Sequence, residues 1–193
     1  MLRIATEDHI PAILEIYTPY ILESTATFEY TAPTLEEFTQ RFRSVTAQHP
    51  WLVWEEEGRV LGYAYASPPY TRAGYAWCAE PSIYLLPEAQ GRGIGKRLYR
   101  ALEAILSLQG YHILYALITA ENAGSLAFHR SLGYIQRAEF PDCAVKFNRW
   151  IGLIWMEKRL QISEIPTVFP TPWSQFGQND KKICDILYSL SLS

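Results

Sequence analysis

The chain has 193 residues, of which 49% are hydrophobic, and a formal net charge of −3 at pH 7. This length and apolar content predict one globular domain with a sizeable buried core. The acidic balance and the lack of a long basic run argue against a nucleic-acid partner. The absence of a long apolar run or a signal-peptide core argues against a membrane partner.

The three cysteines, Cys78, Cys143 and Cys184, are odd in number and widely separated, and no Cys-x-x-Cys pair occurs. This pattern argues against a disulfide framework and against a zinc site. We therefore expect inert thiols, no bound metal and a cytoplasmic location.

Two helices are expected in the first quarter of the chain, after a short strand at residues 2–5. Thr6 and the acidic residues behind it favour a helix start, and Pro11 lies early enough to be tolerated. We expect this helix to end near residues 19–21. Pro33 and Thr34 open the second helix, which carries an apolar pair four residues apart, Phe38 and Phe42.

The next elements alternate between strands and helices. Strands are predicted at residues 51–55 and 60–67, joined by a turn at Gly58, and extended chain at 77–86. A helix runs to Gly110, a buried strand spans 112–119, and a short helix starts at Asn122 or Ser125 and closes at Gly133. Segments 134–140 and 150–157 can pair as a hairpin. This mixed order predicts an α/β or α+β domain around a central sheet.

A glycine-rich segment, residues 90–95, links the extended chain at 77–86 to the helix that follows. Glycines allow a tight turn, so several N–H groups can point into one space at a helix start, where the dipole favours an anion. A Walker loop is excluded because Arg97, not Ser or Thr, follows Lys96, and the spacing differs from that of dinucleotide-binding folds. The segment predicts a phosphate-bearing cofactor, with a plain tight turn as the alternative.

The segment Gln90-Gly91-Arg92-Gly93-Ile94-Gly95 resembles the acetyl-CoA signature of the GNAT superfamily of N-acetyltransferases, Gln/Arg-x-x-Gly-x-Gly/Ala. The order of predicted elements also matches that fold. The resemblance implies a mostly antiparallel sheet flanked by helices and splayed between its two central strands. It implies acetyl-CoA bound by Ile83, Tyr84, Leu85, Gln90, Gly91, Arg92, Gly93, Ile94, Gly95, Lys96 and Asn122.

Residues 4–160 resemble one branch of that superfamily, the phosphinothricin and methionine-sulfoximine N-acetyltransferases. The most specific match is Arg72-x-x-Tyr75-x-Trp77-x-x-Glu80-x-Ser82-x-Tyr84, and Asn122-x-x-Ser125-x-x-x-His129-x-x-x-Gly133-Tyr134 comes next. One departure is Trp150-Ile151-Gly152-Leu153, where the branch usually has Trp-x-Asp-Val. A second is Glu29, where a basic residue would be unsurprising. Both departures count against phosphinothricin as the acceptor.

Amide formation from a thioester needs an uncharged amine, and so a base. Glu80 is the candidate base, because partial desolvation near Trp77 and Pro81 would raise the pKa of its carboxyl. An exposed loop carboxylate is the alternative. By resemblance, His129 protonates the leaving thiolate, and a purely structural histidine is equally compatible with the sequence. Asn122 fits either a cofactor contact or a helix N-cap.

Phe28, Arg72 and Tyr75 are the candidate acceptor-binding residues. The guanidinium of Arg72 suits the carboxylate of an amino-acid-like substrate, although a solvated loop arginine is the ordinary alternative. We therefore expect acetyl-CoA-dependent acetylation of a small amine. Acetylation of a peptide N-terminus and a non-catalytic CoA-binding module are the two alternatives.

Residues 161–193 differ in composition from the rest and lie outside the resemblance. The segment is proline-rich at first, and residues 183–192 can form a small packing helix. We expect an acetyltransferase domain at residues 1–160 and a C-terminal extension at 161–193. The resemblance also implies a homodimer.

Overall fold

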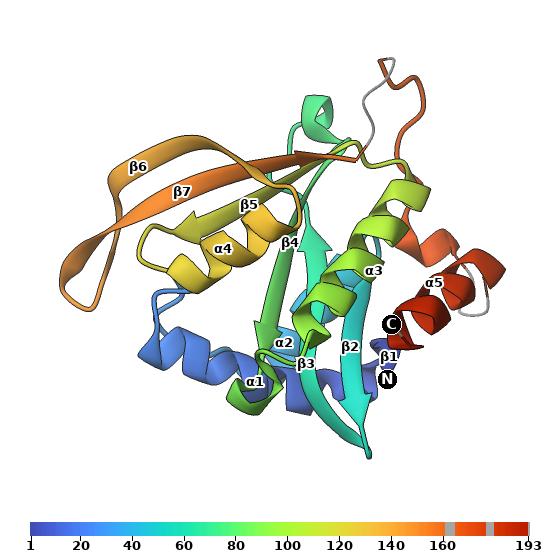
Figure 1. Cartoon of the computed structure of the whole chain (residues 1–193), viewed down its shortest axis with the longest axis horizontal. Coiled ribbons are helices and arrows are strands. Elements are labelled where there is room, and N and C mark those ends of the chain that lie inside the picture. The colour runs from blue at the N-terminus through green and yellow to red at the C-terminus, as the bar shows by residue number, and fades with distance from the viewer. Residues whose placement is uncertain (161–164, 177–179, 193) are drawn as a thin grey trace.

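The computed structural model describes residues 1–160, 165–176 and 180–192. These residues form a seven-stranded sheet in the order β1-β2-β3-β4-β5-β7-β6 (Figure 1). Its strands are β1 (Leu2–Ile4), β2 (Trp51–Glu56), β3 (Arg59–Ser67), β4 (Cys78–Leu85), β5 (Ile113–Thr119), β6 (Ile135–Lys146) and β7 (Arg149–Arg159). The helices are α1 (Ile10–Glu23), α2 (Leu35–Thr46), α3 (Ile94–Gln109), α4 (Ala123–Ser131) and α5 (Lys181–Leu192). The predicted fold class is confirmed.

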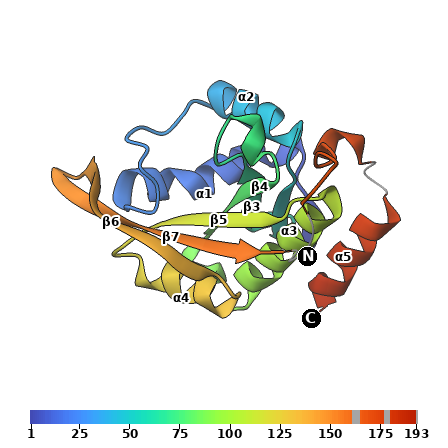
Figure 2. The ribbon, with the colours of Figure 1, turned by 90° about the horizontal axis from the view of Figure 1, so that it is seen from above.

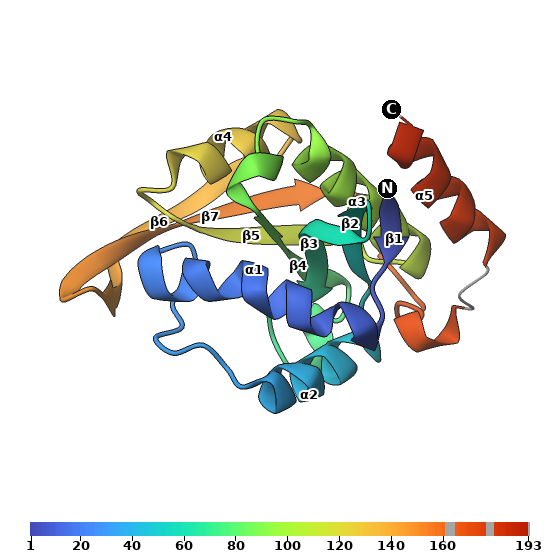
Figure 3. The ribbon, with the colours of Figure 1, turned by 90° about the horizontal axis from the view of Figure 1, so that it is seen from below.

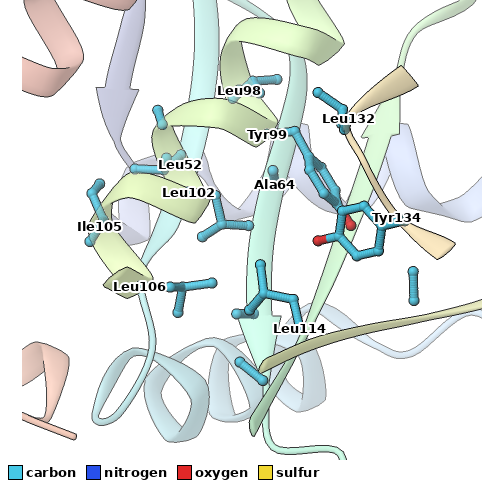
Figure 4. Close-up of a cluster of buried hydrophobic side chains, with 14 of the residues drawn as sticks. Leu52, Ala64, Leu98, Tyr99, Leu102, Ile105, Leu106, Leu114, Leu132 and Tyr134 are labelled. Carbon is cyan, nitrogen blue, oxygen red and sulfur yellow. The ribbon is translucent and has the colours of Figure 1, made fainter. Parts of the chain in front are cut away.

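Helices cover both faces of the sheet. Helices α1 and α2 lie on one face, and α3 and α4 lie on the other, with α5 beside α3 (Figure 2). The larger hydrophobic core lies under α3, where Leu98, Leu102 and Leu106 are fully buried against Ala64 and Leu114 (Figure 4).

Helix α1 is longer than predicted. It continues through Pro19 to Glu23, so an end near residues 19–21 is wrong. A proline removes one backbone donor, but Tyr20 and Ile21 lie against the sheet side of the helix, and Ile21 is fully buried. Packing of this face therefore outweighs the local cost of the proline.

The β6–β7 hairpin is also longer than predicted and projects beyond the body of the molecule (Figure 3). Pro141 favours a break, but the strand continues past it through a shift in register between Phe140 and Ala144. The hairpin closes at Phe147 and Asn148, which adopt left-handed backbone conformations with φ of 51° and 56°. No glycine marks this turn, which is why the sequence did not reveal it.

Strand β4 has two different edges. Six register pairs join it to β3, from Gly62 opposite Leu85 to Ser67 opposite Glu80. Only two pairs join it in parallel to β5, at Cys78 and Ala79. The strands separate beyond Ala79, which is the predicted splay. The last pair is therefore one residue before Glu80, and the opening begins at Glu80.

The C-terminal segment folds back onto the body. The predicted packing helix is confirmed as α5, and its residue Ile183 is fully buried against the core under α3. The N- and C-terminal ends lie close together beside β1 (Figure 1), where the Leu2 N–H donates to Ser191 Oγ over 3.1 Å. The expected boundary near residue 160 adjoins residues 161–164, which lie outside the described part.

Candidate active site

A cavity of about 500 Å³ occupies the opening between β4 and β5. Its walls come from β4 and β5, from the glycine loop with the start of α3, and from α4. Nearly all predicted cofactor and catalytic residues lie along it, namely Glu80, Ile83, Tyr84, Leu85, Gln90, Gly91, Gly93, Gly95, Lys96, Asn122 and His129. Residues predicted from separate motifs are thus brought together in one cavity.

The main chain of β4 presents hydrogen-bonding groups to this cavity. The Leu86 N–H donates to Leu61 O on β3 over 2.9 Å, and hydrogen-bond direction alternates along an antiparallel strand. Tyr84 therefore directs its N–H and C=O to β3, whereas Ile83 and Leu85 direct theirs away from it. Tyr20 of α1 already donates to Leu85 O over 2.6 Å. Ile83 is thus the best placed of the three for a main-chain contact with a ligand.

The start of α3 is a second source of free donors. Gly93 is its N-cap, with φ of 78°, and no side chain caps this end. The first helical bond is that of the Arg97 N–H to Gly93 O, which leaves the N–H groups of residues 94–96 without intrahelical acceptors. Gly91 and Gly93, both at positive φ, line the cavity in front of them. This geometry suits a diphosphate.

Two predicted loop residues contribute differently from the others. Arg92 turns its guanidinium to Glu56, with an Nη2–Oε2 distance of 2.8 Å, and does not line the cavity. The Ile94 side chain is buried in the core, so only its N–H faces the loop. Lys96 does line the cavity and is exposed. The side-chain charge next to the free donors is therefore that of Lys96.

Glu80 is the first β4 residue beyond the last pair with β5, and its side chain is half-buried. Burial raises the pKa of its carboxyl above the ordinary value of 4.5. No hydrogen bond or ion pair to its carboxylate occurs among the described residues. A carboxylate with a raised pKa in a cavity can accept a proton near neutral pH.

His129 of α4 lines the cavity and is only 4% exposed. Its Nδ1 lies 2.8 Å from Ser125 O, a group that only accepts, so Nδ1 carries a hydrogen. Its Nε2 lies 2.8 Å from the Tyr99 hydroxyl, which donates to it when the ring is neutral. Burial lowers the pKa of His129, and the bond to Ser125 opposes that shift.

Asn122 is a helix N-cap, one of the two roles considered for it, and its position is compatible with the other, a cofactor contact. It is the N-cap of α4, where its Oδ1 accepts from the Ser125 N–H over 3.0 Å. It also lines the cavity. Because Oδ1 is committed to the cap, the Asn122 amide NH₂ is the part of the side chain available to a ligand.

The predicted acceptor residues do not line this cavity. Arg72 and Tyr75 are exposed on the loop that joins β3 to β4, which leaves β3 at Ser67, opposite Glu80. Tyr75 packs against Tyr70 at a ring-centroid distance of 4.5 Å. Phe28 is half-buried in the loop after α1, two residues beyond Ala26, which does line the cavity. None of the three residues is therefore part of the cavity wall, although both loops adjoin residues that are.

Several lining residues were not predicted. They come from α1 and the loop after it, from β5 and from α4, and include Tyr20, Ala26, Ala116, Leu117, Ile118, Thr119, Gly124, Ser125 and Phe128. The exposure of Leu117 within a central strand is a sign of the open edge, but it requires the structure. Only the position of Ser125 inside the Asn122–His129 motif could have indicated one of them from sequence.

Gly152 of β7, the position of the departure noted above, lies against the bulge of β6. A Cβ atom there would lie 2.7 Å from Pro141 O and 3.2 Å from Ala120 Cβ. The absence of a side chain at residue 152 therefore permits a close approach of two strands.

Among the described residues, no group of three or more His, Cys, Asp or Glu side chains is arranged to hold a metal ion. None of the helices in that part of the chain is long and apolar enough to cross a membrane.

Comparison with known proteins identifies the class of this fold and site. Residues 10–134 match the model of the Acetyltransferase (GNAT) family. The chain is 34% identical over 164 residues to a phosphinothricin N-acetyltransferase of Alcaligenes faecalis (84% of this chain, 83% of that protein). It is 32% identical to an L-methionine sulfoximine/L-methionine sulfone acetyltransferase of Salmonella typhimurium (86% and 97%).

Among solved structures, a phosphinothricin acetyltransferase of Sinorhizobium meliloti in complex with AcCoA superposes with a TM-score of 0.83, at 34% identity (90% of this chain, 97% of that chain). The chain belongs to the GNAT family of acetyltransferases and is an acyltransferase. The resemblance to its phosphinothricin and methionine-sulfoximine branch is confirmed.

Proposed function

We propose that this protein transfers an acetyl group from acetyl-CoA to the amino group of a small amino-acid-like molecule. The observation that carries the proposal is the opening between β4 and β5, which joins free main-chain donors to a carboxylate of raised pKa. The names of the relatives support an acceptor of the methionine sulfoximine or phosphinothricin type.

The residues around the cavity fit acetyl-CoA. The free N–H groups of residues 94–96 and the ammonium of Lys96 suit its pyrophosphate, and the Ile83 main chain suits its pantetheine amides. When bound, acetyl-CoA supplies a thioester whose carbonyl carbon accepts an amine. Direct transfer is proposed rather than a relay through cysteine, because buried Cys78 is not among the cavity-lining residues.

Glu80 acts as the general base. An α-ammonium group is largely protonated near pH 7, so a proton must leave its nitrogen before that nitrogen can bond to the acetyl carbon. The Glu80 carboxylate takes this proton, directly or through a water. Once the carbon–nitrogen bond has formed, the nitrogen loses its second proton to solvent, and the carbon–sulfur bond breaks. The thiolate that leaves then takes up a proton, so one proton is lost from nitrogen and one is gained by sulfur in this step.

His129 supplies that proton from its protonated form, in which Nε2 donates to the Tyr99 hydroxyl and the hydroxyl turns to its other acceptor, Pro81 O at 3.3 Å. Burial lowers the pKa of His129, which favours release of the proton and also makes the protonated form scarcer near neutral pH. On the acceptor side, Phe28 and Tyr75 provide apolar contacts, and the Arg72 guanidinium pairs with the substrate carboxylate.

The test is a panel of amines incubated with acetyl-CoA, with release of free CoA thiol as the readout. The panel contains amino acids, methionine sulfone and sulfoximine, phosphinothricin, polyamines and a peptide with a free N-terminus. Turnover of a small amino-acid-like amine supports the proposal, and turnover of the peptide alone favours peptide acetylation. Binding of acetyl-CoA without any turnover favours a non-catalytic module.

We also propose a homodimer and a cytoplasmic location. Phe140, Phe147 and Trp150 of the projecting hairpin are exposed, and such an apolar surface suits contact with a second copy. Cys143 and Cys184 are exposed free thiols, which suits a reducing compartment. Light scattering of the intact chain and of Trp150→Glu tests the dimer. A monomer in both samples would refute it.

A further inference from the structure

Among the described residues of the C-terminal segment, Val168 and Phe169 contact the side chain of Trp77, which lies just before β4. The Trp77 Nε1–H donates to Val168 O over 2.8 Å. The Phe169 ring stacks on the Trp77 ring, with 5.0 Å between centroids and 12° between planes. Val168 and Phe169 are otherwise exposed, so Trp77 accounts for the contact that fixes them.

The segment itself is firmly attached to the body. The Thr171 N–H donates to Gln109 O over 2.7 Å, and Gln109 Nε2 donates back to Thr171 O over 2.8 Å. The Trp173 N–H donates to Gln48 O over 3.1 Å, and the Trp173 side chain is buried. Residues 168–173 are therefore held against the body at Thr171 and Trp173, and the other end of this stretch contacts Trp77.

Trp77 lies where β4 and β5 meet. Its carbonyl accepts from the N–H groups of both His112 and Ile113, at 2.9 and 3.2 Å, immediately before the first parallel pair. It follows Tyr75 by two residues and precedes Glu80 by three. Trp77 thus connects the exposed loop to the strand that carries the proposed base.

The loop at residues 68–76 has few restraints of its own. Its backbone hydrogen bonds are two turn contacts, from the Tyr75 N–H to Arg72 O and from the Ala76 N–H to Ala73 O. Arg72 and Tyr75 are exposed, Tyr75 packs on Tyr70 of the same loop, and Tyr70 lies against Trp155 of β7 with 6.1 Å between ring centroids. The conformation of such a loop depends on how its ends are held.

We propose that Val168 and Phe169 are positioning residues for acceptor binding. By holding Trp77, they keep the 68–76 loop in the conformation in which Arg72 and Tyr75 meet the amine substrate beside Glu80. This inference rests on the proposed acceptor role of that loop. The C-terminal extension is then part of the acceptor site, although none of its described residues lines the cavity.

The test uses Phe169→Ala in the full chain, with Tyr188→Ala as the matched control, because Tyr188 is an exposed aromatic of the same segment. Loss of the aromatic pair should raise the KM for the amine by about two- to tenfold and leave the Kd for acetyl-CoA unchanged. Hydrogen exchange at the Tyr75 and Ala76 amides should accelerate by a similar factor. Phe169→Tyr should restore both values.

Arg72→Ala is measured in parallel to separate the two proposals. Unchanged amide exchange in Phe169→Ala overturns the inference. Unchanged KM in Phe169→Ala, together with a raised KM in Arg72→Ala, also overturns it but leaves the acceptor role of the loop intact. If amide exchange is faster in Phe169→Ala but the KM is unchanged in both variants, the loop has no acceptor role. Val168 and Phe169 then have no effect on substrate binding.

Discussion

The two edges of β4 differ in what they bind. The edge facing β3 is paired along its length, from Leu85 to Glu80, and its hydrogen bonds stabilise the fold. The edge facing β5 is paired only at Cys78 and Ala79, and beyond them its polar groups face a cavity. Unpaired buried backbone groups are costly unless something satisfies them. One strand therefore serves both as structure and as a ligand-binding edge.

Two glycines differ in the same way as the two edges of β4: Gly62 lies at the paired edge and Gly93 at the open edge. A Cβ on Gly62 of β3 would lie 2.2 Å from Leu85 Cδ2 and 3.0 Å from Tyr84 O, so close strand packing requires this glycine. Gly93 has open space around the Cβ position but a φ of 78°. It is needed for its backbone conformation, which exposes the α3 donors. The first glycine belongs to the paired edge and the second to the open one.

The largest expected effect is on the chemistry at the open edge. Glu80→Gln should lower kcat by about 10²–10⁴-fold, because the amide cannot accept the substrate proton. In the native enzyme, kcat/KM should fall as pH decreases through the raised pKa of Glu80. Glu15→Gln, which alters an exposed carboxylate on α1, should leave both kinetic values unchanged. Steady-state kinetics between pH 5 and 9 measures these effects.

The stability of Glu80→Gln provides a second check. Burial raises the folded-state pKa above 4.5, so the carboxyl favours folding most at low pH and loses that contribution as pH rises through the folded pKa. The variant should therefore have a higher Tm than the native protein at pH 8 and a similar Tm at pH 4. A lower Tm at pH 8 would contradict a desolvated carboxylate.

The two glycines separate stability from ligand affinity. Gly62→Ala should lower the free energy of unfolding by about 1–3 kcal/mol through overpacking. Gly93→Ala should raise the Kd for acetyl-CoA about tenfold, because a left-handed alanine costs about 1–2 kcal/mol and displaces the donors. Denaturation and calorimetric titration of both variants test the division. If both substitutions change the free energy of unfolding, or both change the Kd, to the same extent, the two glycines do not have separate roles.

Tyr99 should control the pKa of His129, the proposed general acid. Tyr99→Phe removes the hydroxyl that stabilises neutral His129 at Nε2, so the pKa of His129 should rise, by an amount that NMR titration measures. We expect a kcat change of a few-fold, since a buried hydrogen bond contributes about 1 kcal/mol. An unchanged His129 titration would show that the hydrogen bond does not control this histidine.

The smallest effects distinguish the two cations of the loop. Lys96→Ala should raise the Kd for acetyl-CoA about two- to fivefold, since a charge beside a helix N-terminal anion site contributes about 0.3–1 kcal/mol. Arg92→Ala should leave that Kd unchanged, because its guanidinium is paired with Glu56. A larger loss in Arg92→Ala would mean that this arginine leaves Glu56 to meet the ligand.

The sequence predicted the elements whose causes are local. The helix start at Thr34, which the structure closes with a Thr34–Glu37 capping box, and the glycines before α3 depend on residues a few positions apart, and both helix starts occur as expected. The cavity itself depends on how β5 lies beside β4, which no local pattern encodes. The same limit applies to Arg92 of the glycine loop, whose partner Glu56 lies on β2, and to Tyr20, which reaches Leu85 across 65 residues.

The close contact at Gly152 also constrains how this chain can diverge from its relatives. Any side chain introduced at residue 152 meets Pro141 O within 2.7 Å, so an aspartate there requires a compensatory change in the neighbouring strand. Residues 141–143 and residue 152 should consequently covary among homologues.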